Sequence, residues 1–577
     1  MIVKKEYFMM NRFMWAMIPL ALASITSAAP QTQKQPNILL IVADDLGYSD
    51  IEPFGWEIPT PNLKKLAQNG TTLTDFHAGP TCSVTRSMLL TGNDHHQAGL
   101  GTMAEYLQPE QIGKAGYEGK LNRRVMTLPE VLKNNGYKTY MTGKWHLGGG
   151  EDSLPNARGF DKSFILVPGG ADHFKQIALF PNYPAKYKED GKDASLPDNF
   201  YSTDFYTDKL LSYLKDDRKK GEPFFAYVAY TSPHWPLQAP DAYLKKYQGK
   251  YEDGYDVVRQ QRLKKQIELG IVPANTQINN PFKDKFPAWD KLTPWQKADQ
   301  AKTMQVYAAM IDNLDHNIGR IFKHLEENGE LDNTIVLFIS DNGAESSTPE
   351  SLGTTAHKNG IRKWVDETFD NSLENMGKDN SYVALGPQWA QVSSTPYPYF
   401  KSYLANGGIR VPAIIQYPNQ KKKANLNHDL AHVIDFVPTM LDLANIQRPK
   451  TNQGETLLAM EGRSILPTLQ GKKQPERGIG WEFNTRRAYY QGDWAVQMQA
   501  PPYGTGQWEL YNRKNDPSFL HNLALSNTKQ TEKMAKAWDQ YAKHVGVVYA
   551  PVRYKYGQMN CFYDTCVQPE FLKNQTD

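Results

Sequence analysis

The sequence has little net charge. Its 577 residues include 65 Lys and Arg against 62 Asp and Glu, a formal charge of +3. A leader that carries Lys4, Lys5 and Arg12 against Glu6 accounts for +2 of this, so its removal leaves +1. A chain with so small a charge has no global basic field, and we therefore predict that nucleic acid is not a partner.

The sequence also lacks apolar runs of membrane-spanning length. Its first apolar run, Met14 to Ile25, is about a dozen residues long, whereas a membrane span needs roughly 20. Basic residues precede the run and Ser27-Ala28-Ala29-Pro30 follows it, which is the layout of a secretory signal peptide. We predict a signal peptide at residues 1–28, export to the periplasm or the medium, and no stable membrane insertion. An uncleaved anchor and an internal start at Met10 are the alternatives.

Cysteine is scarce, with three residues in the chain. Cys561 and Cys566 are five positions apart and could form a small surface disulfide, or they could be two unrelated reduced thiols. Either way Cys82 is left over. An unpaired cysteine in an exported protein indicates a special role.

The first three quarters of the chain alternate apolar runs with amphipathic segments. Residues 36–43 are apolar almost throughout, as expected for a strand buried on both faces of a parallel sheet, and further strands are predicted at 137–142, 224–230 and 334–340. A long helix is predicted at 303–327, where apolar residues recur every three or four positions. Residues 241–300 are rich in charged residues and are predicted to be a solvated surface excursion.

The pattern changes after about residue 445. Short strands between 481 and 511 predict a small antiparallel sheet, and residues 530–545 predict a helix with one apolar face. The fold class is therefore α/β. We expect a central, mostly parallel sheet flanked by helices at 29–445 and a smaller C-terminal domain at 446–577, which holds the antiparallel sheet and a helix.

Polar residues follow each predicted strand of the large sheet. Asp44 and Asp45 follow the first strand, and Asp341 and Asn342 follow the last. Between them in sequence, Lys144 and His146 follow the second strand and His234 follows the third. Because ligands of open α/β sheets bind outside the carboxyl ends of the strands, these side chains are expected to converge. Carboxylate and amide oxygens favour Ca²⁺, with Mg²⁺ less favoured.

The leftover cysteine lies in the stretch Gly79 to Gly92. Cys82 is predicted at the first turn of a short helix that ends at Gly92, where unpaired backbone N–H groups favour a thiolate or an oxyanion. Arg86 follows one helical turn later on the same face and could hold an anion. By itself the pair is also compatible with a buried cysteine beside a surface arginine.

Read with its surroundings, this stretch resembles a family signature. Cys-x-x-x-Arg followed by Ser-Met-Leu-Leu-Thr-Gly is similar to the motif of formylglycine-dependent sulfatases, a branch of the alkaline phosphatase superfamily, and the overall layout looks like a bacterial arylsulfatase. The resemblance extends from Asn37 to Trp508-Glu509-Leu510-Tyr511 and implies the mixed sheet of that superfamily. It also implies that a formylglycine-generating maturation enzyme oxidises Cys82 to an aldehyde, whose hydrate supplies the nucleophile. The family pattern has Pro or Ala where this chain has Val84.

The resemblance also implies a role for each site residue. The metal would bind Asp44, Asp45, Asp341, Asn342 and an oxygen of the modified Cys82. Arg86 and Lys144 would hold the nucleophile and the sulfate, and Asp341 would assist deprotonation of the attacking hydroxyl. His234 and Lys401 would assist the leaving alcohol, and His146 would remove the proton of the second hydroxyl so that sulfate leaves.

Three functions remain open from the sequence. The first is hydrolysis of a small-molecule or carbohydrate sulfate ester, with no residue code that separates aryl from carbohydrate substrates. The second is a phosphonate monoester or phosphodiester hydrolase of the same superfamily. The third is a silent binding protein in which Val84 blocks maturation and Cys82 stays a thiol.

Overall fold

The computed structural model describes residues 35–55, 57–353, 360–452 and 454–573. The predicted signal peptide at 1–28 lies outside the described residues. Among the described helices, none is long and apolar enough to cross a membrane.

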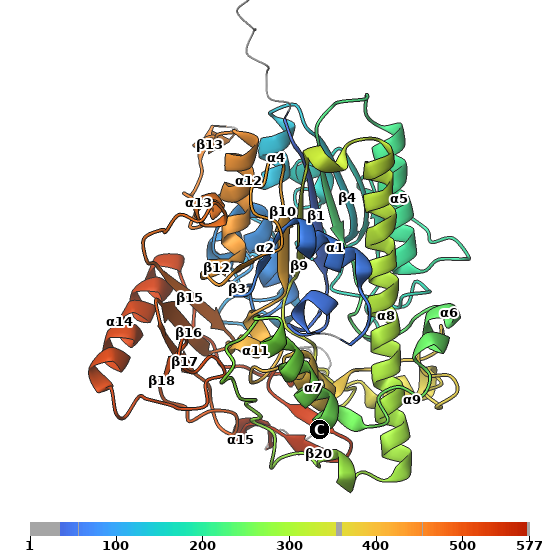
Figure 1. Cartoon of the computed structure of the whole chain (residues 1–577), viewed down its shortest axis with the longest axis vertical. Helices are drawn as coiled ribbons and strands as arrows, with labels where there is room; N and C mark the ends of the chain where they lie inside the picture. Colours follow the sequence, from blue (N-terminus) through green and yellow to red (C-terminus); the bar gives the residue numbers. More distant parts are fainter. Residues whose placement is uncertain (1–34, 56, 354–359, 453, 574–577) are drawn as a thin grey trace, which may run out of the picture. The chain divides into compact units, whose positions relative to one another are not determined.

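A ten-stranded mixed sheet organises most of the chain (Figure 1). Its centre is five parallel strands in the order β9 (Thr334–Ser340), β1 (Asn37–Ala43), β8 (Phe224–Ala229), β4 (Lys138–Lys144) and β5 (Lys162–Leu166). The outer strands are β10 (Ala413–Gln416), β2 (Thr71–Leu73) and β11 (Asn425–Asn427) on one side, and β6 (Tyr187–Glu189) and β7 (Lys192–Asp193) on the other. Antiparallel pairing of β10 with β9 and of β6 with β5 makes the sheet mixed, so the predicted fold class is confirmed.

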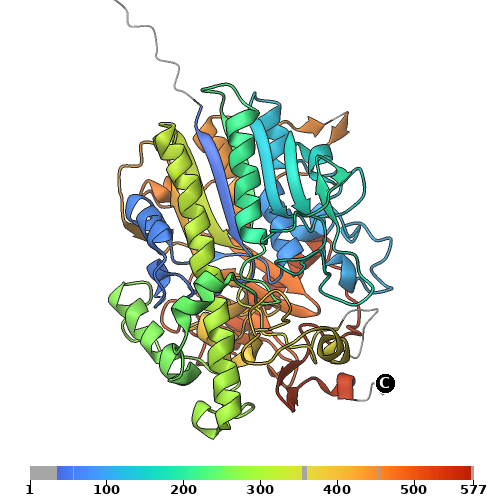
Figure 2. The same ribbon diagram turned by 90° about the vertical axis from the view of Figure 1, so that its right-hand side faces the viewer.

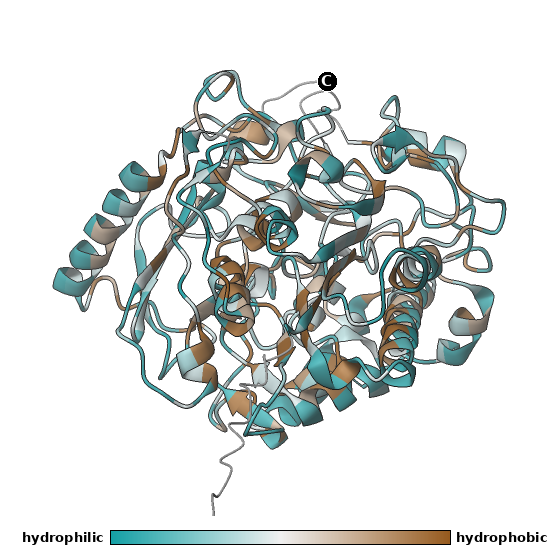
Figure 3. Ribbon diagram, turned by 90° about the horizontal axis from the view of Figure 1, so that it is seen from above, coloured by the Kyte–Doolittle hydropathy of each residue, from teal (hydrophilic) through white to brown (hydrophobic). Residues whose placement is uncertain are grey.

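Helices cover both faces of this sheet because its central strands are apolar on both sides. In β1, Leu39 and Ile41 pack in the same core cluster as residues of α8 (Pro294–Glu327), together with α5 (Ser202–Asp216) and α1 (Pro61–Asn69). The alternate residues Ile38 and Leu40 pack in a second cluster with α2 (Cys82–Thr91), α4 (Leu128–Lys133) and α12 (Phe436–Ala444). Figure 2 shows the sheet between these layers, and in Figure 3 hydrophobic residues gather on the elements near the centre.

Two sequence predictions need correction here. The helix predicted at 303–327 begins at Pro294, because Thr293 and Gln296 form a capping box around that proline. The segment 241–300 is not simply a solvated surface, since α7 (Gly254–Glu268) buries Tyr255, Val258 and Leu263. Its Arg262 is also buried and binds Asp50 at 2.7 Å, which explains how a charged sequence can pack inward.

The C-terminal strands form a separate antiparallel sheet. Its order is β15 (Gly478–Phe483), β16 (Arg486–Gln491), β17 (Trp494–Met498) and β18 (Glu509–Asn512), and α14 (Thr528–Val545) packs Met534 and Trp538 against it. The hairpin of β19 (Asn560–Phe562) and β20 (Thr565–Val567) carries the disulfide Cys561–Cys566. A domain boundary near residue 445 remains a prediction.

A buried charged cluster ties this sheet to α3 (His95–Ala98). Asp94 caps the helix, and its Oδ1 lies 2.8 Å from His96 Nδ1, while His96 Nε2 lies 3.3 Å from Glu482 Oε2 in β15. Burial by itself would lower the pKa of His96, but its hydrogen bonds to the two carboxylates outweigh burial and raise the pKa to about 9. His96 is therefore an imidazolium at neutral pH.

We predict that this cluster makes stability fall in alkali. Because the folded pKa of His96 lies above its unfolded value, the stabilisation is complete below about pH 6.5 and is lost as the pH rises through about 9, to the extent of roughly 1–3 kcal/mol. Urea unfolding measured from pH 6 to 10 tests this. His96→Gln should flatten the alkaline decline, whereas His544→Gln, at an exposed histidine, should leave it intact. An unchanged pH profile for His96→Gln would refute the role.

Candidate active site

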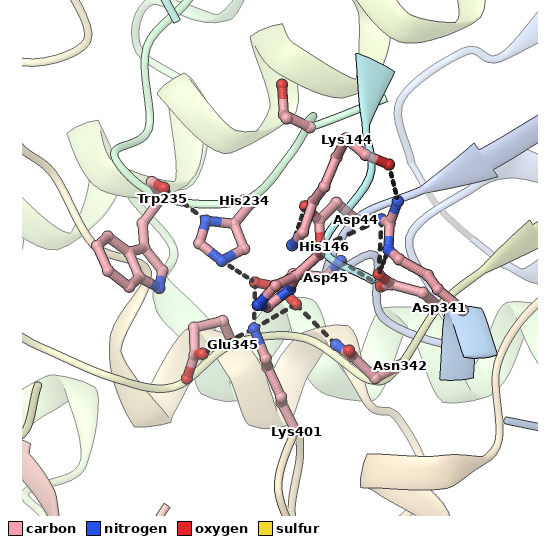
Figure 4. Close-up of polar contacts among 12 residues, drawn as sticks. Asp44, Asp45, Lys144, His146, His234, Trp235, Asp341, Asn342, Glu345 and Lys401 are labelled. Atoms are coloured by element: carbon pink, nitrogen blue, oxygen red, sulfur yellow. Dashed lines mark hydrogen bonds and ion pairs between the residues drawn. The ribbon is translucent and has the colours of Figure 1, made fainter. Parts of the chain in front are cut away.

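The polar residues predicted at the strand ends do converge (Figure 4). Asp44 and Asp45 follow β1, Asp341 and Asn342 follow β9, Lys144 ends β4 with His146 two residues beyond, and His234 lies in the loop after β8. Lys401 reaches the same place from the segment before α11 (Asn406–Ile409), and Cys82 and Arg86 reach it from α2. All the sequence-predicted site residues are thus brought together.

One half of the site is built around Asp44 and Asp341. Lys144 Nζ donates to Asp44 Oδ2 at 2.7 Å, and Arg86 donates through Nε and Nη2 to Asp341 Oδ2 at 2.9 and 2.7 Å. The remaining guanidinium nitrogen of Arg86 donates to the carbonyl oxygen of Lys144 at 3.0 Å. All four side chains are fully buried.

The other half is built around Asp45, whose backbone has a φ of 65°. Lys401 Nζ lies 2.8 Å from Asp45 Oδ1, and the amide nitrogen of Asn342 donates to the same oxygen at 2.7 Å. His234 Nε2 lies 3.5 Å from Asp45 Oδ2, and its Nδ1 is 2.6 Å from the carbonyl oxygen of Trp235. Nδ1 is therefore the protonated nitrogen, and Nε2 faces the carboxylate and the site.

Burial sets the ionisation of these groups. Burial would lower the pKa of each lysine, but Asp44 raises that of Lys144 and Asp45 raises that of Lys401, so both remain cations. Burial raises the pKa of Asp45 to about 8 against the attraction of Lys401, with a smaller contribution from Asp44. Burial and Asp44 likewise raise the pKa of Asp341. Two carboxylates of the cluster thus resist ionisation unless more positive charge is supplied.

The donor set fits a hard divalent cation. Ligand-type atoms of Asp44, Asp45, Cys82 and His234 lie within 4.8 Å of one another. Among the described residues, Asp44 Oδ1 and Asn342 Oδ1 are buried without a hydrogen-bond partner, although buried oxygens are normally paired. Two orphaned oxygens beside carboxylates with raised pKa values are what a Ca²⁺ or Mg²⁺ site requires.

Cys82 begins α2 as predicted, and Gly92 ends that helix with a φ of 70°. The expected thiolate is wrong, however. Cys82 is 2% exposed, and its burial raises the pKa of the thiol far above its ordinary value, although Lys144 and Lys401 act in the opposite direction. An unmodified Cys82 would thus be a poor nucleophile at neutral pH.

A small cavity of about 70 Å³ opens onto these groups. Cys82, His146, His234 and Lys401 line it on one side. Its remaining wall is largely apolar and aromatic, and consists mainly of Met103, Tyr106, Leu179, Phe180, Tyr183, Trp235 and Tyr556. A cavity with charged side chains on one side and aromatic side chains on the other can bind a ligand in which a small anionic group is attached to an apolar group.

A larger depression of about 880 Å³ lies elsewhere, and none of the predicted site residues lines it. Its Arg410 and Arg513 pair with Asp75, and its Arg477 pairs with Asp435. Because Cys82, His146, His234 and Lys401 line the smaller cavity, we assign the chemistry to it.

Three residues of the site were missed from the sequence. Glu105 lies 3.0 Å from His146, Glu345 lies 3.1 Å from Lys401, and the hydroxyl of Tyr556 donates to Glu345 at 3.2 Å. Glu345 follows Asn342 by three positions and could have been suspected. Glu105 lies in a short 3-10 helix (Ala104–Tyr106) and Tyr556 in an irregular segment, and neither has a periodic pattern, so only the fold brings them in.

The comparisons with known proteins agree with this geometry. The family model described as Sulfatase matches residues 36–446. The chain belongs to the sulfatase family. This sulfatase is 43% identical to an uncharacterized sulfatase of Schizosaccharomyces pombe over 90% of its own length and 95% of the relative's. It is 39% identical to the arylsulfatase of Klebsiella aerogenes over 81% and 99% of the two chains.

A solved structure shares the fold. The crystal structure of Ps i-CgsB in complex with k-i-k-neocarrahexaose superposes with a TM-score of 0.62 at 22% identity, covering 88% of this chain and 93% of that one. Family and relatives together identify this sulfatase as a sulfuric ester hydrolase.

Proposed function

We propose that this sulfatase hydrolyses aryl sulfate esters, using an aldehyde made from Cys82 and one bound Ca²⁺. The observation that supports this best is the cavity, where Cys82 lies between buried cations and an aromatic wall. A sulfate group would meet Lys401 and His234, while a phenyl ring would pack on Phe180 and Trp235. The arylsulfatase of Klebsiella aerogenes is similar over nearly its whole length, which favours the same substrate class. Export with removal of residues 1–28 is part of the same proposal.

Asp44, Asp45, Asp341 and Asn342 would hold the cation together with the modified Cys82. When bound, Ca²⁺ would withdraw negative charge from the oxygens around it, and the aldehyde hydrate would supply the attacking hydroxyl. Ca²⁺ is preferred to Mg²⁺ because the donors include a side-chain amide and several carboxylates, which suit a larger coordination shell.

The chain's own residues then have distinct tasks. Arg86 fixes Asp341 through two hydrogen bonds to Oδ2, and the backbone N–H of Asp45 donates to Oδ1 at 3.2 Å. Held in this way, Asp341 would assist deprotonation of the attacking hydroxyl. Lys144 and Lys401 stay charged and bind the anionic sulfate. Lys401 and His234 would assist the leaving oxygen. Burial lowers the pKa of His234, so its Nε2 would carry a proton for this step only when the sulfate anion is bound beside it.

We predict that a bound metal ion stabilises the folded protein. Protein stripped with a chelator should gain thermal stability when Ca²⁺ is restored, because an ion that binds only the folded state stabilises it by about 2.7 kcal/mol at one hundred times its Kd. Mg²⁺ should give a smaller gain. Asp45→Asn and Asp341→Asn should abolish the Ca²⁺-dependent rise in Tm, whereas Asp152→Asn, at an exposed position, should retain it. A full rise in both site variants would exclude this metal site.

We predict that Val84 limits the conversion of Cys82 to the aldehyde. Val84 is fully buried at the third position of α2. The maturation enzyme acts on an unfolded segment, where proline would hold φ near −65° and valine retains more conformers. After folding, proline is tolerated in the first helical turn, because the N–H groups there have no intrahelical partner. A recombinant preparation should therefore be a mixture of aldehyde and thiol at Cys82. Val84→Pro should raise the aldehyde fraction and the activity in proportion, with KM nearly unchanged.

Mass spectrometry of the Cys82 peptide measures this fraction directly. Val84→Ala, the other residue of the family pattern, is the matched variant, and Cys82→Ala is the inactive control. Complete conversion of the unmodified Val84 protein, or a change of activity without a change of aldehyde fraction, would contradict the role given to Val84. Activity that persists in Cys82→Ala would refute the proposed nucleophile.

A further inference from the structure

In the proposed function His146 would be the base that takes a proton from the second hydroxyl at residue 82, as the resemblance implies, and the resemblance does not say which ring nitrogen acts. His146 lies just beyond β4 with a φ of 56°, a left-handed backbone conformation that directs its side chain into the cavity beside Cys82. Gly169 lies against its ring, and a Cβ added there would come within 2.7 Å of Cε1 and 3.2 Å of Nδ1. The close approach of Gly169 therefore restricts rotation of the imidazole ring.

The two nitrogens of this ring have different surroundings. Nε2 lies 3.0 Å from Glu105 Oε1, at an imidazole whose side chain is 10% exposed. Nδ1 is buried and, among the residues that the structure describes, has no hydrogen-bond partner. A buried nitrogen without a partner in a catalytic cavity is placed to accept a proton from a group that the chain alone does not provide.

Glu105 is an ionised carboxylate at neutral pH. Burial would raise its pKa, but the attraction and hydrogen bond of His146 outweigh burial, and Lys144 adds a smaller effect, so the pKa falls to about 2. A carboxylate can only accept a hydrogen bond. Nε2 must therefore carry the proton, and the neutral ring has its lone pair at Nδ1.

We propose that Glu105 is a positioning residue that fixes His146 as the Nε2–H tautomer and so makes Nδ1 the nitrogen that takes up the proton. The role of the proton transfer rests on the proposed function. The tautomer rests on the contact between Nε2 and the Glu105 carboxylate. In the step concerned, Nδ1 accepts the proton of the free hydroxyl at residue 82, and His146 becomes an imidazolium paired with Glu105. The electron pair left on that oxygen forms the carbonyl bond of the aldehyde while the bond from the same carbon to the sulfate oxygen breaks, and sulfate leaves with the electrons of that bond.

Nitrogen-15 NMR of protein labelled at histidine tests the tautomer without any turnover. At a pH where the ring is neutral, the resonance pair that disappears in His146→Gln should show a protonated Nε2 and an unprotonated Nδ1. This holds for the thiol form of the protein as well. A protonated Nδ1 in the wild-type protein would overturn the proposal.

Variants of Glu105 test the catalytic consequence. Glu105→Gln keeps the size of the side chain, but its amide can donate to Nε2 and so stabilise the wrong tautomer. We expect kcat to fall by about 10²–10⁴-fold, as when the carboxylate of a catalytic triad is replaced by its amide, with a much smaller change in KM. Glu105→Asp should recover part of the loss and retain the Nε2–H signature. Glu110→Gln, in the same stretch but exposed and paired with Arg553, is the matched control.

The outcomes separate the two proposals. Wild-type activity and tautomer in Glu105→Gln would refute the positioning role while leaving the sulfatase mechanism intact. An inactive but aldehyde-bearing wild-type protein with the Nε2–H signature would refute the proposed function and support the tautomer assignment.

Discussion

The site depends on the mutual compensation of charges that have been taken out of water. Asp44, Asp45 and Asp341 are buried, and Arg86, Lys144 and Lys401 are buried with them. Each ion would cost several kcal/mol to bury alone, so none of these side chains is tolerable without its neighbours. The pairing is incomplete, since burial still raises the pKa values of Asp45 and Asp341 and two oxygens lack partners. The proposed dication would complete the balance and would link folding of the site to metal binding.

The fold supplies this arrangement by bringing distant loops into backbone contact. Gly343, beside Asn342, donates its N–H to the carbonyl oxygen of Gly408 at 2.9 Å. A Cβ on Gly343 would lie 1.9 Å from the carbonyl oxygen of Gly407, so only glycine permits the loop that carries Asp341 and Asn342 to touch the segment that follows Lys401. The C-terminal part contributes as well, because Tyr556 reaches Glu345 and through it Lys401. The reactive centre is thus assembled from segments that span most of the described sequence.

Local patterns were sufficient to predict the central strands, because a strand that is buried on both faces must be apolar. They also predicted the polar site residues, because the carboxyl ends of such strands lie at the edge of the sheet where ligands bind. The short helix α2 was predicted from the glycine that ends it, because Gly92 readily adopts the left-handed conformation found after a helix. Tertiary effects were not predictable in this way. Burial reversed the expected ionisation of Cys82, and Glu105 and Tyr556 approach the site from segments without a periodic pattern. The charged residues of the segment 241–300 suggested a solvated surface. The buried partner of its Arg262 is Asp50, which is too distant in sequence to be recognised from the local pattern.

We propose that this site transfers the sulfuryl group of a monoester. The most direct test of this proposal compares kcat/KM for a nitrophenyl sulfate and for a phosphate diester of the same nitrophenol, using protein whose aldehyde content is known. Both substrates are monoanions with the same leaving group, but the diester carries a second organic group next to the reacting centre, for which a cavity of about 70 Å³ leaves little room. We expect a higher kcat/KM for the sulfate ester than for the phosphate diester. A higher value for the diester, or no turnover of the sulfate by aldehyde-bearing protein, would contradict it.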